Sequence, residues 1–351
     1  MLLYIHVPFC DSKCFYCSFN SYVDKLYLKE RYTDALLEQF VFDKDRFGLE
    51  KKGVETLFIG GGTPSTLPIK LYEKIFKKIS PFFGDDLEIT IEANPNSASK
   101  EWLKGVKELG ANRVSFGVQS FSDKKLKYLG RNHSSKMAID AVESAYKTGF
   151  KNISIDLIHD CVIEDKNMLK SDLYIASKLP INHISSYSLT IEKGTKFYKI
   201  RERSKENEEE QKWFYEQIVS LGFPRYEVSN FGRYKCKHNL GYWEHKDYIG
   251  LGSGAVGFLK NRRFYPEKNV EKYIQNPTYF KSEELSKEEL KEEKLFLGLR
   301  SIVGFEQSIL NSKEIKKLDT LIDEKIVIKK DGRVFNRNFM ISDEIALFIL
   351  N

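Results

Sequence analysis

The stretch LLYIHVPFCDSKCFYC, residues 2–17, joins a short apolar run to a loop of closely spaced cysteines. The apolar run, 2–7, has the length and composition of a buried β-strand. Cys10, Cys14 and Cys17 follow it at the spacing C-x3-C-x2-C, which lets one compact loop present all three thiols to one metal centre. A strand that leads directly into candidate metal ligands predicts an α/β fold whose chemistry takes place at the carboxyl ends of its strands.

The rest of the N-terminal two thirds repeats this order of strand and helix. Short apolar runs alternate with longer amphipathic patterns, which predicts parallel strands joined by right-handed crossovers. A complete barrel of eight units takes about 250 residues, whereas the six units found here end near residue 222. We therefore predict an open, six-stranded parallel (β/α)6 partial TIM barrel with strands at 2–7, 56–61, 87–93, 113–118, 152–158 and 183–189.

The last part of the chain predicts a second, smaller domain. Residues 312–350 have the pattern of a helix, a hairpin that turns at Asp331-Gly332, and a final helix. This winged-helix-like outline is shared with some nucleic-acid readers. No densely basic helix precedes the hairpin, however, so we expect no nucleic-acid partner. We predict a barrel at 1–222, a connecting segment at 223–285 and an α+β C-terminal domain at 286–351.

Composition restricts the cellular setting. The chain has 351 residues, an odd count of five cysteines, and a net charge of +6 spread over 56 basic and 50 acidic residues. It shows no secretory signal pattern and no apolar run near the roughly 18 to 20 residues that a membrane-spanning helix needs. We therefore expect a cytoplasmic protein without an integral membrane segment. In that reducing compartment a cysteine cluster is more often metal-binding or catalytic than structural.

The number of cysteines in the loop is informative. Iron-sulfur clusters are held by cysteine thiolates, normally four of them. With three, one iron keeps an open coordination position, which an amino acid could occupy through its amino and carboxylate groups. A zinc site that includes His6 is the alternative, but it leaves the signals at the other strand ends unexplained. These signals are GGGTPS (60–65), EANP (92–95), GVQSF (117–121) and Asp156.

Together these segments resemble a known superfamily. The cysteine loop with GGGTP (60–64) resembles the radical S-adenosylmethionine (SAM) superfamily. SFGVQSF (115–121), YSLTIEKGT (187–195) and HNLGYW (238–243) resemble its coproporphyrinogen III oxidase-like (HemN-like) branch and, within it, the HemW family of heme chaperones. The oxidases carry a further cysteine two positions after the third one, whereas this chain has Phe19, as HemW-like members do.

The resemblance implies cofactors and contacts. Cys10, Cys14 and Cys17 would hold a 4Fe-4S cluster whose open iron binds SAM, and an electron donor would reduce the cluster. Whether SAM is cleaved or only bound stays open. The positions that match SAM contacts are Tyr4, Tyr16, Gly62, Thr63, Glu92, Gln119, Arg131 and Asp156.

The segment 235–258 carries a second signature, HNxxYW, which resembles the heme-binding motif of HemW. It offers an imidazole able to ligate heme iron and aromatic faces able to pack on a porphyrin. The residues are His238, Asn239, Tyr242 and Trp243, with Cys236 and His245 as alternative ligands. Without the resemblance, a packed aromatic corner around a hydrogen-bonded histidine explains the same residues.

The resemblance therefore implies a heme chaperone that passes heme to acceptor proteins, respiratory membrane hemoproteins among them, and the family allows a homodimer. An oxygen-independent coproporphyrinogen III oxidase, or another radical SAM enzyme acting on a porphyrin, is the alternative. A metal-stabilised binding protein is a third.

The segment after the fifth predicted strand departs from the family pattern. Relatives usually continue this strand with Gly-Leu-Pro, whereas HDCVIEDKN follows Ile158 here, so we expect a differently shaped loop near Asp156.

Overall fold

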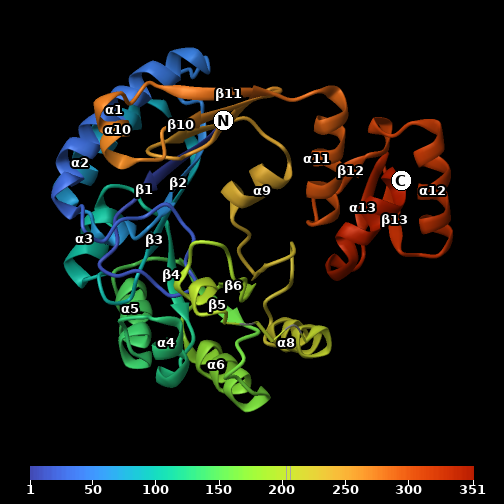
Figure 1. Ribbon diagram of the computed structural model, residues 1–351, viewed down its shortest axis with the longest axis horizontal. Helices are drawn as coiled ribbons and strands as arrows, with labels where there is room; N and C mark the ends of the chain where they lie inside the picture. The colour runs from blue at the N-terminus through green and yellow to red at the C-terminus, as the bar shows by residue number, and fades with distance from the viewer. Residues whose placement is uncertain (203, 206) are drawn as a thin grey trace.

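The computed structural model describes residues 1–202, 204–205 and 207–351, and its centre is an open parallel barrel (Figure 1). Six parallel strands lie side by side in chain order, which confirms the predicted (β/α)6 core. Their bounds are β1 Leu2–Val7, β2 Val54–Gly61, β3 Phe83–Ala93, β4 Arg113–Gln119, β5 Asn152–His159 and β6 His183–Ser188.

Helices between these strands cover the outside of the barrel (Figure 1). Ser99, Ser134 and Asp165 each accept a hydrogen bond from a backbone N–H of the first turn of the helix that follows, so polar N-caps fix where these helices begin. The helices are α1 Lys29–Arg46, α2 Ile69–Ile79, α3 Lys100–Glu108, α4 Asp123–Leu129, α5 Ser135–Lys147 and α6 Lys166–Lys178.

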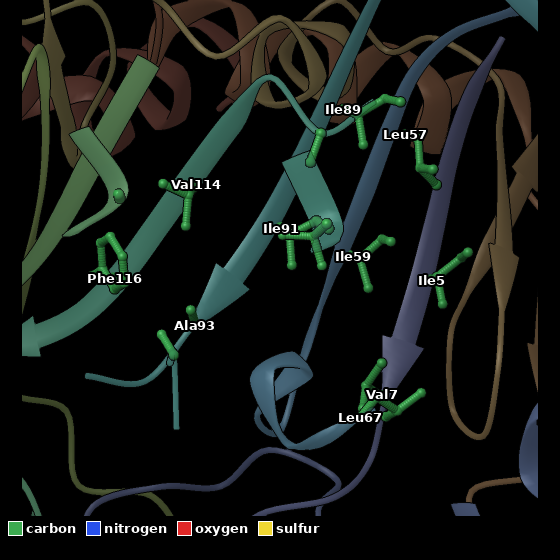
Figure 2. Close-up of a cluster of buried hydrophobic side chains, with 14 of the residues drawn as sticks. Ile5, Val7, Leu57, Ile59, Leu67, Ile89, Ile91, Ala93, Val114 and Phe116 are labelled. Carbon is green, nitrogen blue, oxygen red and sulfur yellow. The ribbon is translucent and has the colours of Figure 1, made fainter. Parts of the chain in front are cut away.

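Alternation along each strand separates the core from the barrel interior. Ile5, Ile59 and Ile91 are buried on the face that packs in one hydrophobic cluster with the helices (Figure 2). Their neighbours Tyr4 and Glu92 point to the opposite face, because successive side chains of a strand alternate sides. The same strands therefore supply both an apolar core and a polar interior.

The sheet extends beyond the six predicted strands on both sides. Strand β7 (Asn230–Gly232) pairs antiparallel with β6, and β8 (Tyr248–Leu251) pairs parallel with β1. Strands β9 (Gly257–Leu259), β10 (Arg262–Pro266) and β11 (Phe280–Glu284) continue from β8. The expected connecting segment, 223–285, thus contributes strands to the main sheet.

Four further helices accompany the end of the barrel and this extension. They are α7 Lys196–Lys199, α8 Glu208–Ser220, α9 Lys237–Trp243 and α10 Val270–Gln275. Helix α9 lies near the ends at which β1 and β2 begin, because its His238 contacts Thr56 early in β2. The Glu88 carboxylate accepts hydrogen bonds from the backbone N–H groups of Lys237 (2.9 Å) and His238 (3.0 Å), which stabilises the positive end of this helix.

The C-terminal part has its own core around a three-stranded sheet, which confirms the smaller α+β unit. Asp331 and Gly332 have φ angles of 50° and 79°, as a tight hairpin requires, and they turn the chain where predicted. Its elements are α11 Lys287–Leu299, β12 Phe305–Glu306, α12 Ser312–Asp323, β13 Val327–Lys330, β14 Arg333–Asn336 and α13 Ser342–Leu350. No helix in the described ranges has both the length and the apolar character to cross a membrane.

Candidate functional site

A cavity of about 370 Å³ opens at the carboxyl ends of the barrel strands. It collects the three loop cysteines and seven of the eight positions that match SAM contacts. These residues are Cys10, Cys14, Cys17, Tyr16, Gly62, Thr63, Glu92, Gln119, Arg131 and Asp156. The eighth position, Tyr4, lines an adjacent cavity of about 500 Å³, which shares Gly61 and Glu92 with the first.

The cysteine loop is anchored by backbone hydrogen bonds rather than by disulfides. Cys10 N–H donates to the Tyr22 carbonyl (3.1 Å), and Phe15 N–H donates to the Leu129 carbonyl (3.0 Å). All three thiols are free, and Cys10 is buried while Cys14 and Cys17 are half-buried. Burial raises the pKa of Cys17, so a bound cation or metal would be needed to stabilise its thiolate.

Gly62 permits a close approach between two segments of the site. A Cβ on this residue would lie 2.9 Å from the Phe9 carbonyl oxygen and 3.0 Å from Cys10 Sγ. The neighbouring Thr63 hydroxyl donates to Cys10 Sγ at 3.4 Å. In the structure this glycine lets the GGGTP turn pack directly on the cysteine loop, and it also lines the cavity, so the predicted ligand contact stays a prediction.

Arg131 connects the cysteine loop to the neighbouring strand ends. Its guanidinium donates to Cys14 Sγ (3.2 Å), to Asn94 Oδ1 (2.8 Å) and to the Gly117 carbonyl (2.6 Å). Asn94 also donates to Thr63 Oγ1 at 3.1 Å, so it bridges two of the predicted positions. We did not single out Asn94 from the sequence, although its place directly after a predicted strand was a usable signal.

Two half-buried carboxyl groups, Glu92 and Asp156, line the cavity and favour a ligand that carries positive charge. Glu92 accepts a hydrogen bond from Gly61 N–H (3.2 Å), and Asp156 accepts one from the Ser115 hydroxyl (3.3 Å). Burial, reinforced by the charge of Asp156, raises the pKa of Glu92 to about 8. Burial also raises the pKa of Asp156. A ligand with an ammonium group and hydroxyls would relieve this desolvation.

Gln119 reaches the cavity through an unusual backbone conformation. Its φ angle is 67°, a left-handed value that is uncommon outside glycine. The pairing of β4 with β5 shifts register between Phe116 and Gln119, and such bulges re-aim side chains near sites. The amide of Gln119 is therefore directed by local strain of order 1–3 kcal/mol.

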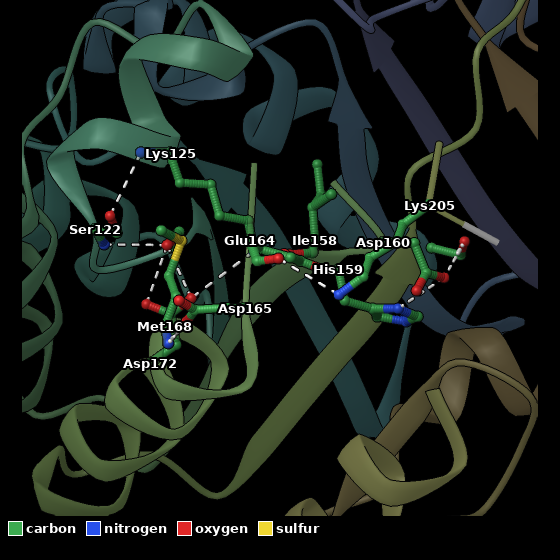
Figure 3. A network of polar contacts seen from close by, with 12 residues as sticks. Ser122, Lys125, Ile158, His159, Asp160, Glu164, Asp165, Met168, Asp172 and Lys205 are labelled. Atoms are coloured by element: carbon green, nitrogen blue, oxygen red, sulfur yellow. Dashed lines mark hydrogen bonds and ion pairs between the residues drawn. The ribbon is translucent and has the colours of Figure 1, made fainter. Parts of the chain in front are cut away.

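The loop after β5, which departs from the usual Gly-Leu-Pro, is held by a buried ion pair (Figure 3). Lys125 Nζ donates to the Ile158 carbonyl (2.6 Å) and to Glu164 Oε2 (2.5 Å), and its side chain has 0% exposure. Asp160 in this loop takes a left-handed φ of 64°. Asp156 lines the cavity despite the altered loop.

The four HNxxYW residues lie away from the cavity, within helix α9, from its second residue to its last. His238 is 1% exposed, and its ring nitrogens are within hydrogen-bond distance of Thr56 Oγ1 (2.7 Å) and Tyr242 OH (2.9 Å). Burial, followed by the charge of Arg113, lowers the pKa of His238 to about 3. Along β2, Thr56 and the GGGTP turn are separated by about 15 Å at the usual rise of a strand.

The other motif residues and the alternative ligands also lie outside the cavity lining. Asn239, Tyr242 and Trp243 are half-buried. The thiol of Cys236 is buried 3.4 Å from Glu88 Oε1, and the ring of His245 is 3.0 Å from Glu293 Oε2 on α11. The structure therefore gathers the cysteine and SAM positions at one end of the barrel and leaves the HNxxYW group at the other.

Comparison with known proteins places this geometry in a family. The radical SAM superfamily model matches residues 4–170. A heme chaperone HemW from Bacillus subtilis (strain 168) is 35% identical over 335 residues, covering 91% of this chain and 88% of that relative. The chain belongs to the HemW family of the radical SAM superfamily.

Other relatives agree with the HemW assignment. A heme chaperone HemW from Lactococcus lactis subsp. lactis (strain IL1403) is 35% identical, and the match covers 94% of this chain and 92% of that relative. The solved structure of coproporphyrinogen III oxidase (HemN) from Escherichia coli, a radical SAM enzyme, has a TM-score of 0.82 and 19% identity. The match covers 99% of this chain and 89% of the oxidase chain. At 19% identity this likeness concerns the fold.

Membership in the radical SAM superfamily implies a 4Fe-4S cluster and SAM, and the residues that line the cavity of this chain fit both. Three free thiols from one loop line a single space, as an iron-sulfur cluster with an open position requires. The buried carboxyls and the amide of Gln119 provide acceptors suited to the ammonium and hydroxyl groups of SAM.

Proposed function

We propose that this protein is a heme chaperone that binds heme and a SAM-coordinated 4Fe-4S cluster and transfers the heme to acceptor proteins. The observation that carries the proposal is similarity to heme chaperones over nine tenths of the chain. The cavity at the strand ends supports it, since it gathers the cysteine loop and the positions that match SAM contacts.

In this proposal Cys10, Cys14 and Cys17 would hold the cluster, and the chemistry that it would supply when bound is one-electron reduction. Arg131 orients the loop through Cys14. Glu92 and Asp156 accept hydrogen bonds from the charged and hydroxyl groups of SAM, and Thr63 with Gly62 meets its amino-acid end. Tyr4, Tyr16 and Gln119 complete the contacts around it.

Iron, sulfide and zinc content measured on anaerobically reconstituted protein tests the cluster. We expect about four iron and four sulfide per chain in the native protein, and a near-complete loss of both in Cys14→Ala. The matched control is Cys161→Ala, a buried free cysteine outside the cavity lining, which should keep the cluster. Zinc without sulfide would instead support the metal-stabilised binding protein.

Heme binding is tested by titrating hemin into the reconstituted protein and following the Soret band. Saturable one-to-one binding supports the chaperone, and failure of the native chain to bind would remove it. We keep His238, Asn239, Tyr242 and Trp243 as proposed heme contacts, with His245 and Cys236 as alternative ligands. His238 can reach a heme iron only after its ring leaves Thr56 or Tyr242.

The alternative is an oxygen-independent coproporphyrinogen III oxidase, which shares the fold. It is weakened by Phe19, which lines the cavity with 65% exposure at the position where the oxidases carry a cysteine. Anaerobic incubation with SAM, a reductant and coproporphyrinogen III separates the two functions. We expect no decarboxylated product, whereas turnover would favour the oxidase.

The proposed partners follow from the chaperone role. We propose acceptor hemoproteins, respiratory membrane proteins among them, and an electron donor for the cluster. We also propose that the protein works in the cytoplasm as a monomer or a homodimer. Light scattering with and without heme tests the oligomeric state, and transfer of the Soret signal to an apo-hemoprotein tests delivery.

A further inference from the structure

Exposed basic side chains gather beside the cysteine loop, on helix α4 and on the segment that leads through helix α7. We term them the basic patch, which consists of Lys124, Lys127, Lys193, Lys196 and Lys199. Within the described residues none of the five has an ion-pair partner. Other exposed lysines of the barrel do pair, as Lys136 does with Asp140 and Lys147 with Glu143. The basic patch therefore carries positive charge that the chain itself leaves available to a partner.

Phe15 fixes both segments of the basic patch against the cysteine loop. Its N–H donates to the Leu129 carbonyl at the end of α4 (3.0 Å), and its carbonyl accepts from the Phe197 N–H of α7 (2.9 Å). Lys196 Nζ lies 3.5 Å from the centre of the Phe15 ring, a cation–π contact. Because Phe15 directly follows Cys14, the inner edge of the basic patch lies one residue from a proposed cluster ligand.

Apolar side chains accompany the lysines. The ring centres of Tyr128 on α4 and Phe197 on α7 are 5.0 Å apart, so the two helices lie side by side and their lysines belong to one surface. On this surface Tyr198 and Ile200 are 50% and 58% exposed. Exposed aromatic and aliphatic groups among charged ones are typical of a protein-binding surface, where the apolar groups are desolvated and the charges form the rim.

Acidic side chains of the same segments offset the lysines only in part. Asp123 already accepts a hydrogen bond from the Ser135 N–H (2.7 Å), and Glu202 is half-buried. Glu192 is exposed but lines the cavity that contains the cysteines. The excess of positive charge favours an acidic partner, because complementary charge raises the rate of encounter.

The place of the basic patch decides which acidic partner fits. Electron transfer slows steeply as the distance between two redox centres grows, so a protein that reduces the cluster has to dock close to the cysteine loop. The basic patch meets this condition through Phe15 and Lys196. A nucleic acid or a lipid surface would gain nothing from the neighbourhood of the thiols.

We propose that an acidic one-electron carrier protein docks on the basic patch and reduces the cluster. This inference rests on the proposed cluster-binding function and identifies the surface that receives its electron donor. In the transfer the carrier loses one electron and the cluster gains it, and no bond forms or breaks. The lysines speed the encounter, and Tyr198 and Ile200 supply the apolar contact area.

Binding of an acidic, plant-type 2Fe-2S ferredoxin to full-length, reconstituted protein tests the surface. Lys193→Glu/Lys199→Glu reverses two charges and keeps Lys196 on Phe15, so the Kd should rise about tenfold or more. Lys124→Glu/Lys127→Glu should do the same from the side of α4. The matched control is Lys313→Glu/Lys316→Glu on α12, which changes the net charge equally in the C-terminal domain and should bind as the native chain does.

The rate of cluster reduction gives a second measurement. Iron and sulfide content is determined first, to show that each variant keeps its cluster. Reduced ferredoxin is then mixed with each chain, and bleaching of the cluster absorption is followed in time. Both variants of the basic patch should react about tenfold more slowly than the native chain at low salt, whereas an excess of dithionite should reduce all chains to the same extent.

The outcomes separate this inference from the function on which it rests. If the native chain assembles no cluster, the proposed function itself is lost. If the cluster forms and both variants of the basic patch bind and react as the native chain does, the patch is not the docking surface. If neither ferredoxin nor an acidic flavodoxin binds the native chain, the proposal is wrong, and binding of phosphatidylglycerol vesicles would then assign the patch to a membrane surface.

Discussion

At the scale of single residues, the site depends on which face of a strand a side chain occupies. Ile59 and Ile91 pack in the core, whereas the next inward-facing positions, Gly60 and Glu92, border the cavity. A Cβ on Gly60 would lie 2.8 Å from Glu92 Oε2, so this glycine makes room for the carboxyl. One alternating pattern thus supplies stability outside the barrel and chemistry inside it.

Gly62→Ala should disturb the cysteine loop without unfolding the protein. The added methyl group would press on the Phe9 carbonyl and on Cys10 Sγ, both of which lie within about 3 Å of its position. We expect iron and sulfide content to fall by at least half, with a circular dichroism spectrum like that of the native chain. Gly48→Ala serves as the control: a Cβ there meets no atom within 4 Å, and its left-handed φ of 63° costs some stability outside the cavity lining, so the variant should keep full iron content.

Glu92→Gln should change how stability depends on pH. The folded-state pKa of about 8 lies above the usual value of 4.5, so the unfolded chain releases a proton that the folded chain retains. The contribution of Glu92 to stability is therefore complete below pH 4.5 and declines as pH rises toward 8. Urea unfolding of SAM-free protein should show that Glu92→Gln gains stability relative to the native chain over this interval. A difference that does not vary with pH would show that the Glu92 pKa is not raised.

At the scale of elements, the sequence predicted the parallel core because its strands are long and apolar. All six predicted runs are strands, with ends displaced by at most a few residues. Strands β7 to β11 of the main sheet were missed because each has only three to five residues, too few to show a clear alternation. Motifs at strand ends predicted that the cysteine loop and most positions matching SAM contacts would gather in one cavity. The cavity lined by Tyr215, Arg225 and Phe339 could not be predicted, since segments far apart in the chain form it.

The buried Lys125 network joins α4 to the loop after β5, and its removal should be costly. Lys125→Met would leave Glu164 with an unpaired charge in a site of 0% exposure. Removing one partner of a buried pair costs about 3–5 kcal/mol, and urea unfolding measures that loss. The double variant Lys125→Met/Glu164→Leu should recover part of the stability, because Glu164 no longer leaves an unpaired charge. Asp172, which lies 3.9 Å from Lys125 Nζ in the native chain, keeps its hydrogen bonds from Ser120 and Phe121. Equal losses in the single and double variants would contradict this account.

At the scale of the whole molecule, helix α9 connects the barrel to the C-terminal domain. Its first turn is bound to Glu88 and Thr56 at the floor of the barrel. His245, just beyond its end, and Arg263 on β10 both contact Glu293 of the C-terminal domain. The position of α9 therefore affects how the C-terminal domain sits against the barrel.

Protonation of His238 in acid should destabilise the packing of α9 against the barrel. Burial holds the folded-state pKa of His238 at about 3, below the usual 6.5, so the unfolded chain takes up a proton that the folded chain excludes. The stability that the neutral ring contributes is present above pH 6.5 and is lost as pH falls toward 3. Relative to His238→Gln, which cannot titrate, the native chain should lose up to about 1.4 kcal/mol per pH unit across this interval. Thermal unfolding at stepped pH measures the difference, and amide hydrogen exchange in α9 should accelerate in the native chain first. If both chains lose stability in parallel, the pKa of His238 is not lowered in the folded chain.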